Sequence, residues 1–173
     1  MKQVNWFERN FDFSYEQNIF PSLIERLGGT SLRLNDKISK IPQGFLTVKP
    51  GDKWSIQENI GHLVNLEPLW QGRLQDILNG EKYLRPTDLQ NTQTDRANYN
   101  ERDINTLLAE FQSVRDITLE QLKRLKEEEV YQSALHPRLE TPMRTMDLFL
   151  FVAEHDDHHL ARITGINIQL AKQ

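Results

Sequence analysis

The chain has 173 residues, a net charge of −4 and no cysteine. A chain of this length typically forms one domain, so we expect a single domain over residues 1–173. The lack of cysteine excludes disulfides, thiolate metal sites and a cysteine nucleophile, and with no signal peptide in view it predicts a cytoplasmic protein. With no basic excess and no apolar run long enough to span a bilayer, neither nucleic acid nor a membrane is an expected partner.

The first 40 residues divide into an arm and a helix. Residues 1–14 form an aromatic N-terminal arm with four aromatic side chains, which we expect to pack onto the body. Apolar residues recur at three- and four-residue steps over about 16–40, which predicts a helix. Gly28 and Gly29 interrupt this pattern and Thr30 can cap a restart, so we expect either a kink or two consecutive helices.

The next helix has the strongest start signal in the sequence. Ser55 and Glu58 have the spacing of a capping box, in which serine is the N-cap and glutamate the third helical residue. From Ile56 to Ile77, apolar residues then follow in alternating four- and three-residue steps. Glu67 is the one charged residue on this stripe, and His62 lies at its edge.

The remainder of the chain also reads as helical. Residues 81–102 are polar and predict a long crossover connection. A third helix follows from about Asp103, a candidate N-cap, and runs into a charged stretch at 126–129. An irregular segment at 131–145 then leads to a last helix that Thr145 can cap. Four long helical patterns predict an all-α fold, a four-helix bundle with a long crossover connection.

Three of the five histidines lie close together in the last helix. His155 and His159 are four residues apart, so they share one face of the helix, and the apolar phase places that face in the core. His158 is about 100° away and is expected nearer the surface. The pair can bind one metal ion or can be hydrogen-bonded core histidines. For a third imidazole, His62 is favoured over His136, which we expect to be an exposed loop residue.

Three histidines with one open position are typical of a catalytic metal site, because structural sites have four protein ligands. A metal ion held in this way lowers the pKa of a bound water or binds a thiolate. The candidates to orient the imidazoles are Glu58, Glu67 and Asp156, and helical phase favours Glu67. Arg162, one turn beyond the paired histidines, is either a contact for an anionic substrate group or a surface charge.

Two other metal sites fit the sequence poorly. The spacing of His155 and His159 also occurs in zinc proteases, but Asp156 stands where their glutamate general base lies, and no strand to hold a peptide is evident. A di-iron carboxylate bundle requires two Glu-x-x-His motifs, and the sequence has none.

These motifs resemble a known family. The segments Trp54-Ser55, Glu58 and Gly61-His62-Leu63, followed by Glu154-His155-Asp156-Asp157-His158-His159-Leu160, are similar to the DinB/YfiT-like superfamily of damage-inducible, metal-dependent enzymes. The likeness extends from Glu25-Arg26-Leu27 to the final helix. It implies a four-helix bundle with a long crossover, often dimeric, and a divalent metal, typically zinc or nickel. By motif position its ligands are His62, His155 and His159.

The family also implies a class of reaction. Its relatives include transferases and isomerases that use low-molecular-weight thiols such as bacillithiol or mycothiol, so the resemblance implies a thiol co-substrate. Many relatives have Arg-Gly-Gln after the paired histidines, whereas this chain has Leu160-Ala161-Arg162, which places it in another branch.

Two functions follow from these observations. The first is a divalent-metal-dependent enzyme, a transferase or hydrolase, whose open coordination position activates a thiol or water for attack on a small-molecule substrate. The second is a non-catalytic dimeric helical bundle with a structural or vestigial metal site. The resemblance favours the first.

Overall fold

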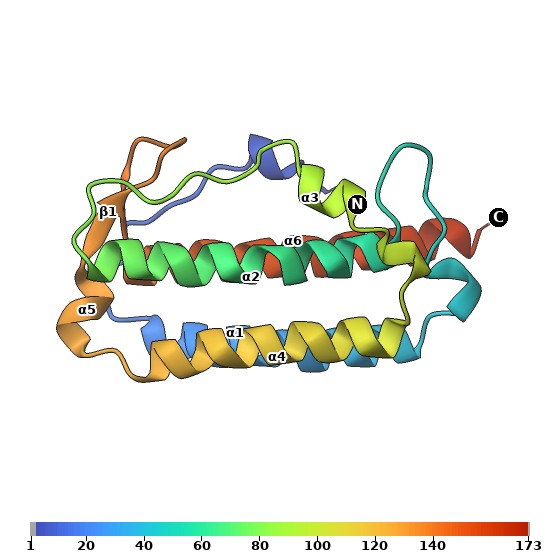
Figure 1. Cartoon of the computed structure of the whole chain (residues 1–173), viewed down its shortest axis with the longest axis horizontal. Helices are drawn as coiled ribbons and strands as arrows, with labels where there is room; N and C mark the ends of the chain where they lie inside the picture. Colours follow the sequence, from blue (N-terminus) through green and yellow to red (C-terminus); the bar gives the residue numbers. More distant parts are fainter. Residues whose placement is uncertain (1–2, 173) are drawn as a thin grey trace.

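The computed structural model describes residues 3–172 and contains four long helices packed as a bundle (Figure 1). The helices are α1 (Phe20–Ser39), α2 (Ile56–Leu78), α4 (Ile104–Lys123) and α6 (Thr145–Leu170). Each of α1 and α2 packs against both α4 and α6. None of the helices described in the structure combines the length and hydrophobicity needed to cross a membrane. The predicted all-α four-helix bundle is confirmed.

A long connection joins α2 to α4. Figure 1 shows that α2 and α4 run in the same direction, so the chain has to return along the bundle between them. Residues 79–103 make this return and contain the short helix α3 (Thr92–Arg96) and the 3-10 turn η3 (Tyr99–Glu101). The crossover predicted for residues 81–102 is therefore present, and it runs beside α2.

Local caps fix where two of the long helices begin. The Ser55 hydroxyl accepts a hydrogen bond from the Glu58 backbone N–H at 3.0 Å, and the Glu58 carboxylate accepts one from the Ser55 N–H at 2.8 Å. Asp103 accepts a hydrogen bond from the Thr106 N–H at 2.8 Å. Both predicted caps are formed, and α2 starts at the turn that positions His62.

Helix α1 is continuous, so the predicted kink or break at Gly28 and Gly29 is wrong. One face of α1 is buried against α4 and α6, and this packing outweighs a cost of about 1 kcal/mol for each helical glycine. Thr30 is not a cap; it is fully buried and donates a hydrogen bond to Asp156 at 2.8 Å.

The segment between α4 and α6 differs from the prediction in two ways. The charged stretch begins a separate short helix, α5 (Glu127–Tyr131), and the segment expected to be irregular contains an antiparallel hairpin of β1 (Ser133–Leu135) and β2 (Pro142–Arg144). Thr145 is the first residue of α6 rather than its cap, and Asp147 accepts a hydrogen bond from the Arg144 N–H at 3.0 Å.

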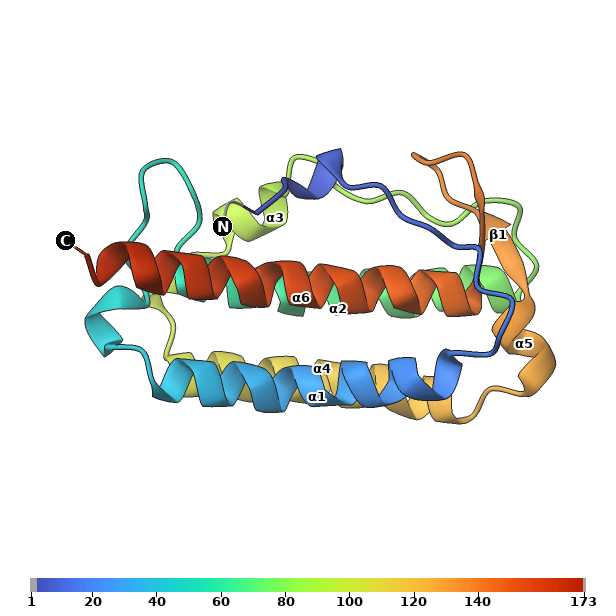
Figure 2. The same ribbon diagram turned by 180° about the vertical axis from the view of Figure 1, so that it is seen from behind.

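The aromatic arm packs against the bundle. Trp6, Phe11 and Phe13 contact a core cluster to which all four long helices contribute, whereas Phe7 is 58% exposed. Figure 2 shows the arm running beside α6 on the same side of the bundle as the crossover. The arm and the crossover therefore cover the face where α2 meets α6.

Candidate metal centre

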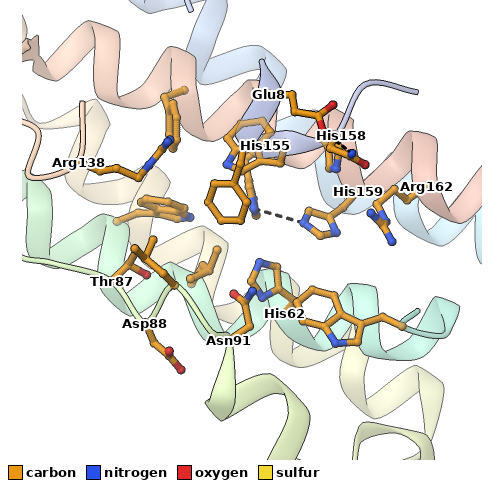
Figure 3. A pocket seen from close by; sticks show the side chains of 18 of the residues that line it. Glu8, His62, Thr87, Asp88, Asn91, Arg138, His155, His158, His159 and Arg162 are labelled. Atoms are coloured by element: carbon orange, nitrogen blue, oxygen red, sulfur yellow. Dashed lines mark hydrogen bonds between the residues drawn. The ribbon is translucent and has the colours of Figure 1, made fainter. Parts of the chain in front are cut away.

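Three histidines meet between α2 and α6. One ring nitrogen from each of His62, His155 and His159 lies within 4.8 Å of the others, and all three side chains are buried. The Nε2 atoms of His155 and His159 are 3.3 Å apart. Figure 3 shows His62 facing this pair from the opposite helix. The structure thus brings together the three histidines that helical phase selects, which we call the three-histidine cluster.

Asn59 sets the orientation of His159. Its side-chain oxygen is 2.8 Å from His159 Nδ1, while its amide nitrogen donates a hydrogen bond to the Ser55 carbonyl at 2.7 Å. Because the amide nitrogen is engaged with a carbonyl, the oxygen faces His159 and accepts the Nδ1 proton. His159 Nε2 therefore carries the free lone pair, which points toward His155.

A chain of hydrogen bonds orients His62. Thr94 Oγ1, from the crossover, lies 3.1 Å from His62 Nδ1 and accepts a hydrogen bond from Asn65 at 3.2 Å. Asn65 in turn accepts one from the Tyr99 hydroxyl at 2.6 Å. The Tyr99 ring lies directly on Gly61, where an added Cβ would come within 2.3 Å of it. The close approach at Gly61 therefore lets the crossover reach His62, whose Nε2 stays available to a ligand.

His155 is the least satisfied of the three histidines. Its Nδ1 is buried and has no hydrogen-bond partner among the residues that the structure describes. The ring packs edge-on against Trp6 and Trp70, with centroid distances of 4.9 and 5.9 Å. A buried ring nitrogen without a partner is costly, so the polarity of this histidine indicates a role other than packing.

Burial keeps all three imidazoles neutral at pH 7. It lowers the pKa of His62 to about 4, a shift that the Asp95 carboxylate opposes and the Arg162 guanidinium reinforces. Burial, together with the neighbouring histidines, also lowers the pKa of His155 and of His159 well below the ordinary value. Neutral imidazole is the form that coordinates metal ions.

The cluster fits a divalent metal ion. Two nitrogens bound to a tetrahedral ion at about 2.0–2.1 Å are roughly 3.4 Å apart, close to the 3.3 Å between His155 Nε2 and His159 Nε2. Three neutral imidazoles with orienting partners on two of them are a donor set typical of zinc, nickel, copper or iron. Binding of a metal here stays a prediction.

A cavity of about 840 Å³ adjoins the three-histidine cluster. The arm contributes Trp6 and Phe7 to its wall, and the crossover contributes Pro86 and Leu89. The charged residues that line it are Glu8, Asp52, Lys53, Arg73, Asp88, Arg138 and Arg162. The histidines thus face a space large enough for a small molecule.

The three carboxylates predicted to orient the imidazoles lie elsewhere. Within the described part of the chain, none of them hydrogen-bonds to a histidine. Glu58 completes the cap of α2 and forms an ion pair with Lys49 at 2.7 Å. Glu67 and Asp156 instead flank the buried guanidinium of Arg115, at 2.6 Å each.

Two histidines expected to be exposed are buried. His158 is 5% exposed because the arm covers it, and its Nδ1 lies 3.0 Å from Gln3 Nε2. His136 is 3% exposed because the hairpin loop folds inward beside Arg73. Both line the cavity, as does the half-buried Arg162, which lies on the far side of the histidines from Arg138 in Figure 3.

Sequence reasoning missed the two residues that orient the histidines. Asn59 precedes His62 by three residues, so it lies on the same side of α2, and a polar residue at that spacing was an available signal. Thr94 lies in the polar crossover, where the sequence has no periodicity to single it out.

Comparison with known proteins places the chain in a family. The model of the DinB superfamily matches residues 27–163, and the chain therefore belongs to the DinB superfamily. A search of curated proteins found no match. Among solved structures, YfiT from Bacillus subtilis is similar, with a TM-score of 0.79 and 20% identity over 95% of this chain and 94% of that one. YfiT is described as "a probable metal-dependent hydrolase with an unusual four-helix bundle topology". At this identity, the likeness shows a shared fold.

Proposed function

We propose that this protein is a divalent-metal-dependent enzyme with His62, His155 and His159 as its ligands, acting on a small-molecule substrate. The observation that carries the proposal is the convergence of three neutral, buried imidazoles on the wall of a cavity of about 840 Å³. A site that faces a cavity leaves room for a substrate or a water beside the three protein ligands. The description of YfiT as metal-dependent agrees with this.

A divalent ion at this position supplies Lewis acidity, which lowers the pKa of a water or thiol that it binds. The residues of the chain hold and shield the site. Asn59 and Thr94 fix two imidazoles so that Nε2 faces the centre. Trp54 packs on His62 with a centroid distance of 4.7 Å, and Trp6 packs on His155 at 4.9 Å. These rings limit the access of bulk water, which strengthens electrostatic interactions inside the site.

Two reactions are compatible with this site. In a hydrolase the activated group is water, and the description of YfiT favours this reaction. In a transferase the activated group is a low-molecular-weight thiol such as bacillithiol or mycothiol, as the family resemblance implies. Zinc and nickel are the metals that we propose, and we propose a homodimer as the assembly, which light scattering can test.

Elemental analysis of the purified protein tests the metal. We expect close to one zinc or nickel per chain in the wild type and less than a tenth of that in His155→Ala and His159→Ala. His136→Ala is the matched control: it removes a buried histidine of the same cavity outside the cluster, and it should keep its metal. A folded wild type that holds no stoichiometric metal, and that gains no thermal stability from added zinc or nickel, contradicts the proposal.

Activity assays then separate the two reactions. Hydrolysis of p-nitrophenyl acetate without thiol, lost in His155→Ala, supports the hydrolase. Metal-dependent conjugation of bacillithiol to 1-chloro-2,4-dinitrobenzene supports the transferase. A stoichiometric metal that resists exchange, with neither activity and no solvent-accessible coordination position, points to the non-catalytic bundle with a structural site.

A further inference from the structure

Arg73, on α2, is a buried cation that forms no ion pair with any residue that the structure describes. Its side chain is 1% exposed, and its Nε donates a hydrogen bond to the Arg85 carbonyl at 3.1 Å. Its Nη2 has no partner within residues 3–172. Asp76, which follows Arg73 by three residues on α2, is engaged by Arg85 through Nε and Nη2. A buried guanidinium left in this state is costly, because it has lost water while Asp76 attracts it only at a distance, without a direct ion pair.

His136 adds a second donor beside Arg73. Its Nδ1 accepts hydrogen bonds from the backbone N–H groups of Arg138 and Leu139, each at 3.2 Å. Backbone N–H groups can only donate, so Nδ1 has no proton and the neutral ring carries its proton on Nε2. That Nε2 lies 3.3 Å from Arg73 Nη1, which also can only donate. Two donors thus face each other with no acceptor between them.

The protonation states at pH 7 follow from burial. Burial lowers the pKa of His136 to about 4, reinforced by the charges of Arg73 and Arg138, so the ring is neutral. Burial also lowers the pKa of Arg73 to about 10; the Asp76 carboxylate opposes this shift, and the charges of Arg138 and Arg85 reinforce it. The guanidinium therefore keeps its charge at pH 7. Arg73 and His136 together therefore present a positive charge and at least two N–H groups at the point where their side chains meet.

This place belongs to the same cavity as the three-histidine cluster. Arg73, His136 and Arg138 line the cavity together with the histidines. Trp70 separates the two ends: its ring lies 5.9 Å from the His155 ring and 5.5 Å from the guanidinium carbon of Arg73. Both ends of the cavity therefore border the Trp70 ring, against which an aromatic part of a ligand can pack.

We propose that Arg73 and His136 form a carboxylate-binding subsite that holds one end of the substrate while its other end lies at the three histidines. The planar fork of arginine matches the two oxygens of a carboxylate, and the His136 N–H adds a third donor. A singly charged group is favoured over a phosphate dianion because Glu8 and Asp88 line the same cavity. The assignment of this ligand as the substrate rests on the proposed function; the anion site itself does not.

Benzoate is a suitable probe because it joins a carboxylate to one aromatic ring. We expect isothermal titration in carboxylate-free buffer at pH 7 to show benzoate binding to the wild type, and Arg73→Met to weaken it at least tenfold. The matched control is Arg124→Met, which removes an exposed arginine outside the cavity and should bind as the wild type does. Unchanged binding in Arg73→Met overturns the subsite. The subsite is also overturned if Arg162→Met loses benzoate binding while Arg73→Met keeps it.

Two further measurements protect the test against misfolding. His136→Phe keeps a ring at this position but removes the N–H, and it should weaken benzoate several-fold. Thermal unfolding without ligand separates binding from packing: Arg73→Met removes an unpaired buried charge, so its Tm should not fall below that of the wild type, and benzoate should raise the Tm of the wild type alone. A lower Tm with an unchanged benzoate shift shows a purely structural arginine.

The outcomes also separate this subsite from the metal site. A protein without metal that still binds benzoate through Arg73 disproves the proposed function and keeps the subsite. A metal-loaded protein that binds benzoate equally well with and without the Arg73 side chain disproves the subsite and keeps the proposed function. Phenyl phosphate that binds more tightly than benzoate, and depends on Arg73, overturns the choice of a carboxylate.

Discussion

Adjacent residues of α6 belong to two polar clusters with opposite hydrogen-bonding states. Asp156 points into the bundle, where it shares Arg115 with Glu67; we call these three residues the Arg115 cluster. His155, the residue before it, points the other way into the cavity between α2, α6 and the arm. Both clusters are buried and both combine polar groups from several helices, yet only one is complete within the described residues.

The Arg115 cluster is satisfied on every side. Arg115 donates to Glu67 and Asp156 at 2.6 Å each and to the Leu27 carbonyl at 3.2 Å. Thr30 donates to Asp156 at 2.8 Å, and Thr118 donates to Glu67. Burial raises the pKa of Glu67, and the Arg115 guanidinium opposes this shift. Because its three members come from α2, α4 and α6 and hydrogen-bond to Thr30 and Leu27 of α1, the cluster links all four helices.

The cavity side shows the opposite condition. His155 Nδ1 and Arg73 Nη2 are buried atoms for which the described residues provide no partner, and both side chains line the same cavity. A buried polar group that is satisfied stabilises one arrangement of the helices, whereas one that is unsatisfied is costly until a ligand arrives. The comparison therefore assigns the Arg115 cluster to the fold and the cavity residues to ligand binding.

The largest expected effect comes from breaking the Arg115 cluster. Arg115→Met leaves the Glu67 and Asp156 carboxylates buried without a counter-ion, which should lower the free energy of unfolding by about 3–5 kcal/mol. Urea denaturation at pH 7, followed by far-UV circular dichroism, measures this change. The variant should still bind metal in its folded fraction, because no side chain of the cluster hydrogen-bonds to a histidine within the described chain.

The matched control removes all three charges together. Arg115→Met combined with Glu67→Gln and Asp156→Asn should recover part of the lost stability, since no unpaired charge then remains buried. A loss below about 1 kcal/mol in Arg115→Met alone, or loss of metal without loss of stability, contradicts the division between the two clusters.

The parts of the fold that were predictable from the sequence depend on local interactions. Ser55 and Glu58 cap α2 through hydrogen bonds within three residues, so the pattern and the structure agree. The continuity of α1 through Gly28 was not predictable, because it depends on burial against α4 and α6, which lie far along the chain. The hairpin near residue 134 is similar: its strands have three residues each, too few for a periodic pattern to develop.

The same distinction applies to the site. Helical phase placed His155 and His159 on the apolar face of one long helix and His62 at the edge of that of another, which was enough to select the three histidines that meet. The burial of His158 and His136 was not predictable, because the groups that cover them come from the non-periodic arm and hairpin loop. Glu67 was correctly placed inward, but its partner Arg115 is on another helix, and no pairing signal links the two in one sequence.

A smaller effect is expected from loosening the three-histidine cluster without removing a ligand. Asn59→Ala deprives His159 of the acceptor for its Nδ1 proton, which should weaken metal binding about 10–100-fold, or roughly 1.4–2.7 kcal/mol. Competition with a chromophoric chelator measures this affinity. Asn59→Asp keeps an acceptor at the same position and should retain most of the affinity.

Asn65 provides a graded comparison for this prediction. It reaches His62 only through Thr94, so Asn65→Ala should weaken metal binding less than Asn59→Ala does. Equal affinity in Asn59→Ala and the wild type would show that the orientation of His159 does not depend on Asn59.

The smallest expected effect is a pH dependence at the other end of the cavity. His136 has a pKa of about 4 in the folded chain, below the ordinary 6.5 that we take for the unfolded chain. Between these values only the unfolded chain binds the proton, so the contribution of His136 to stability falls as the pH drops from 7 to 5. His136→Phe cannot bind this proton, so its free energy of unfolding should fall over that range by about 1–2 kcal/mol less than that of the wild type.

Urea denaturation of both proteins at pH 7 and pH 5, in buffer without carboxylates, measures the difference. The contributions of the other histidines are the same in both proteins and cancel. Equal losses in the two proteins would mean that His136 accepts a proton in the folded state at pH 5, which conflicts with a ring whose two nitrogens both meet donors.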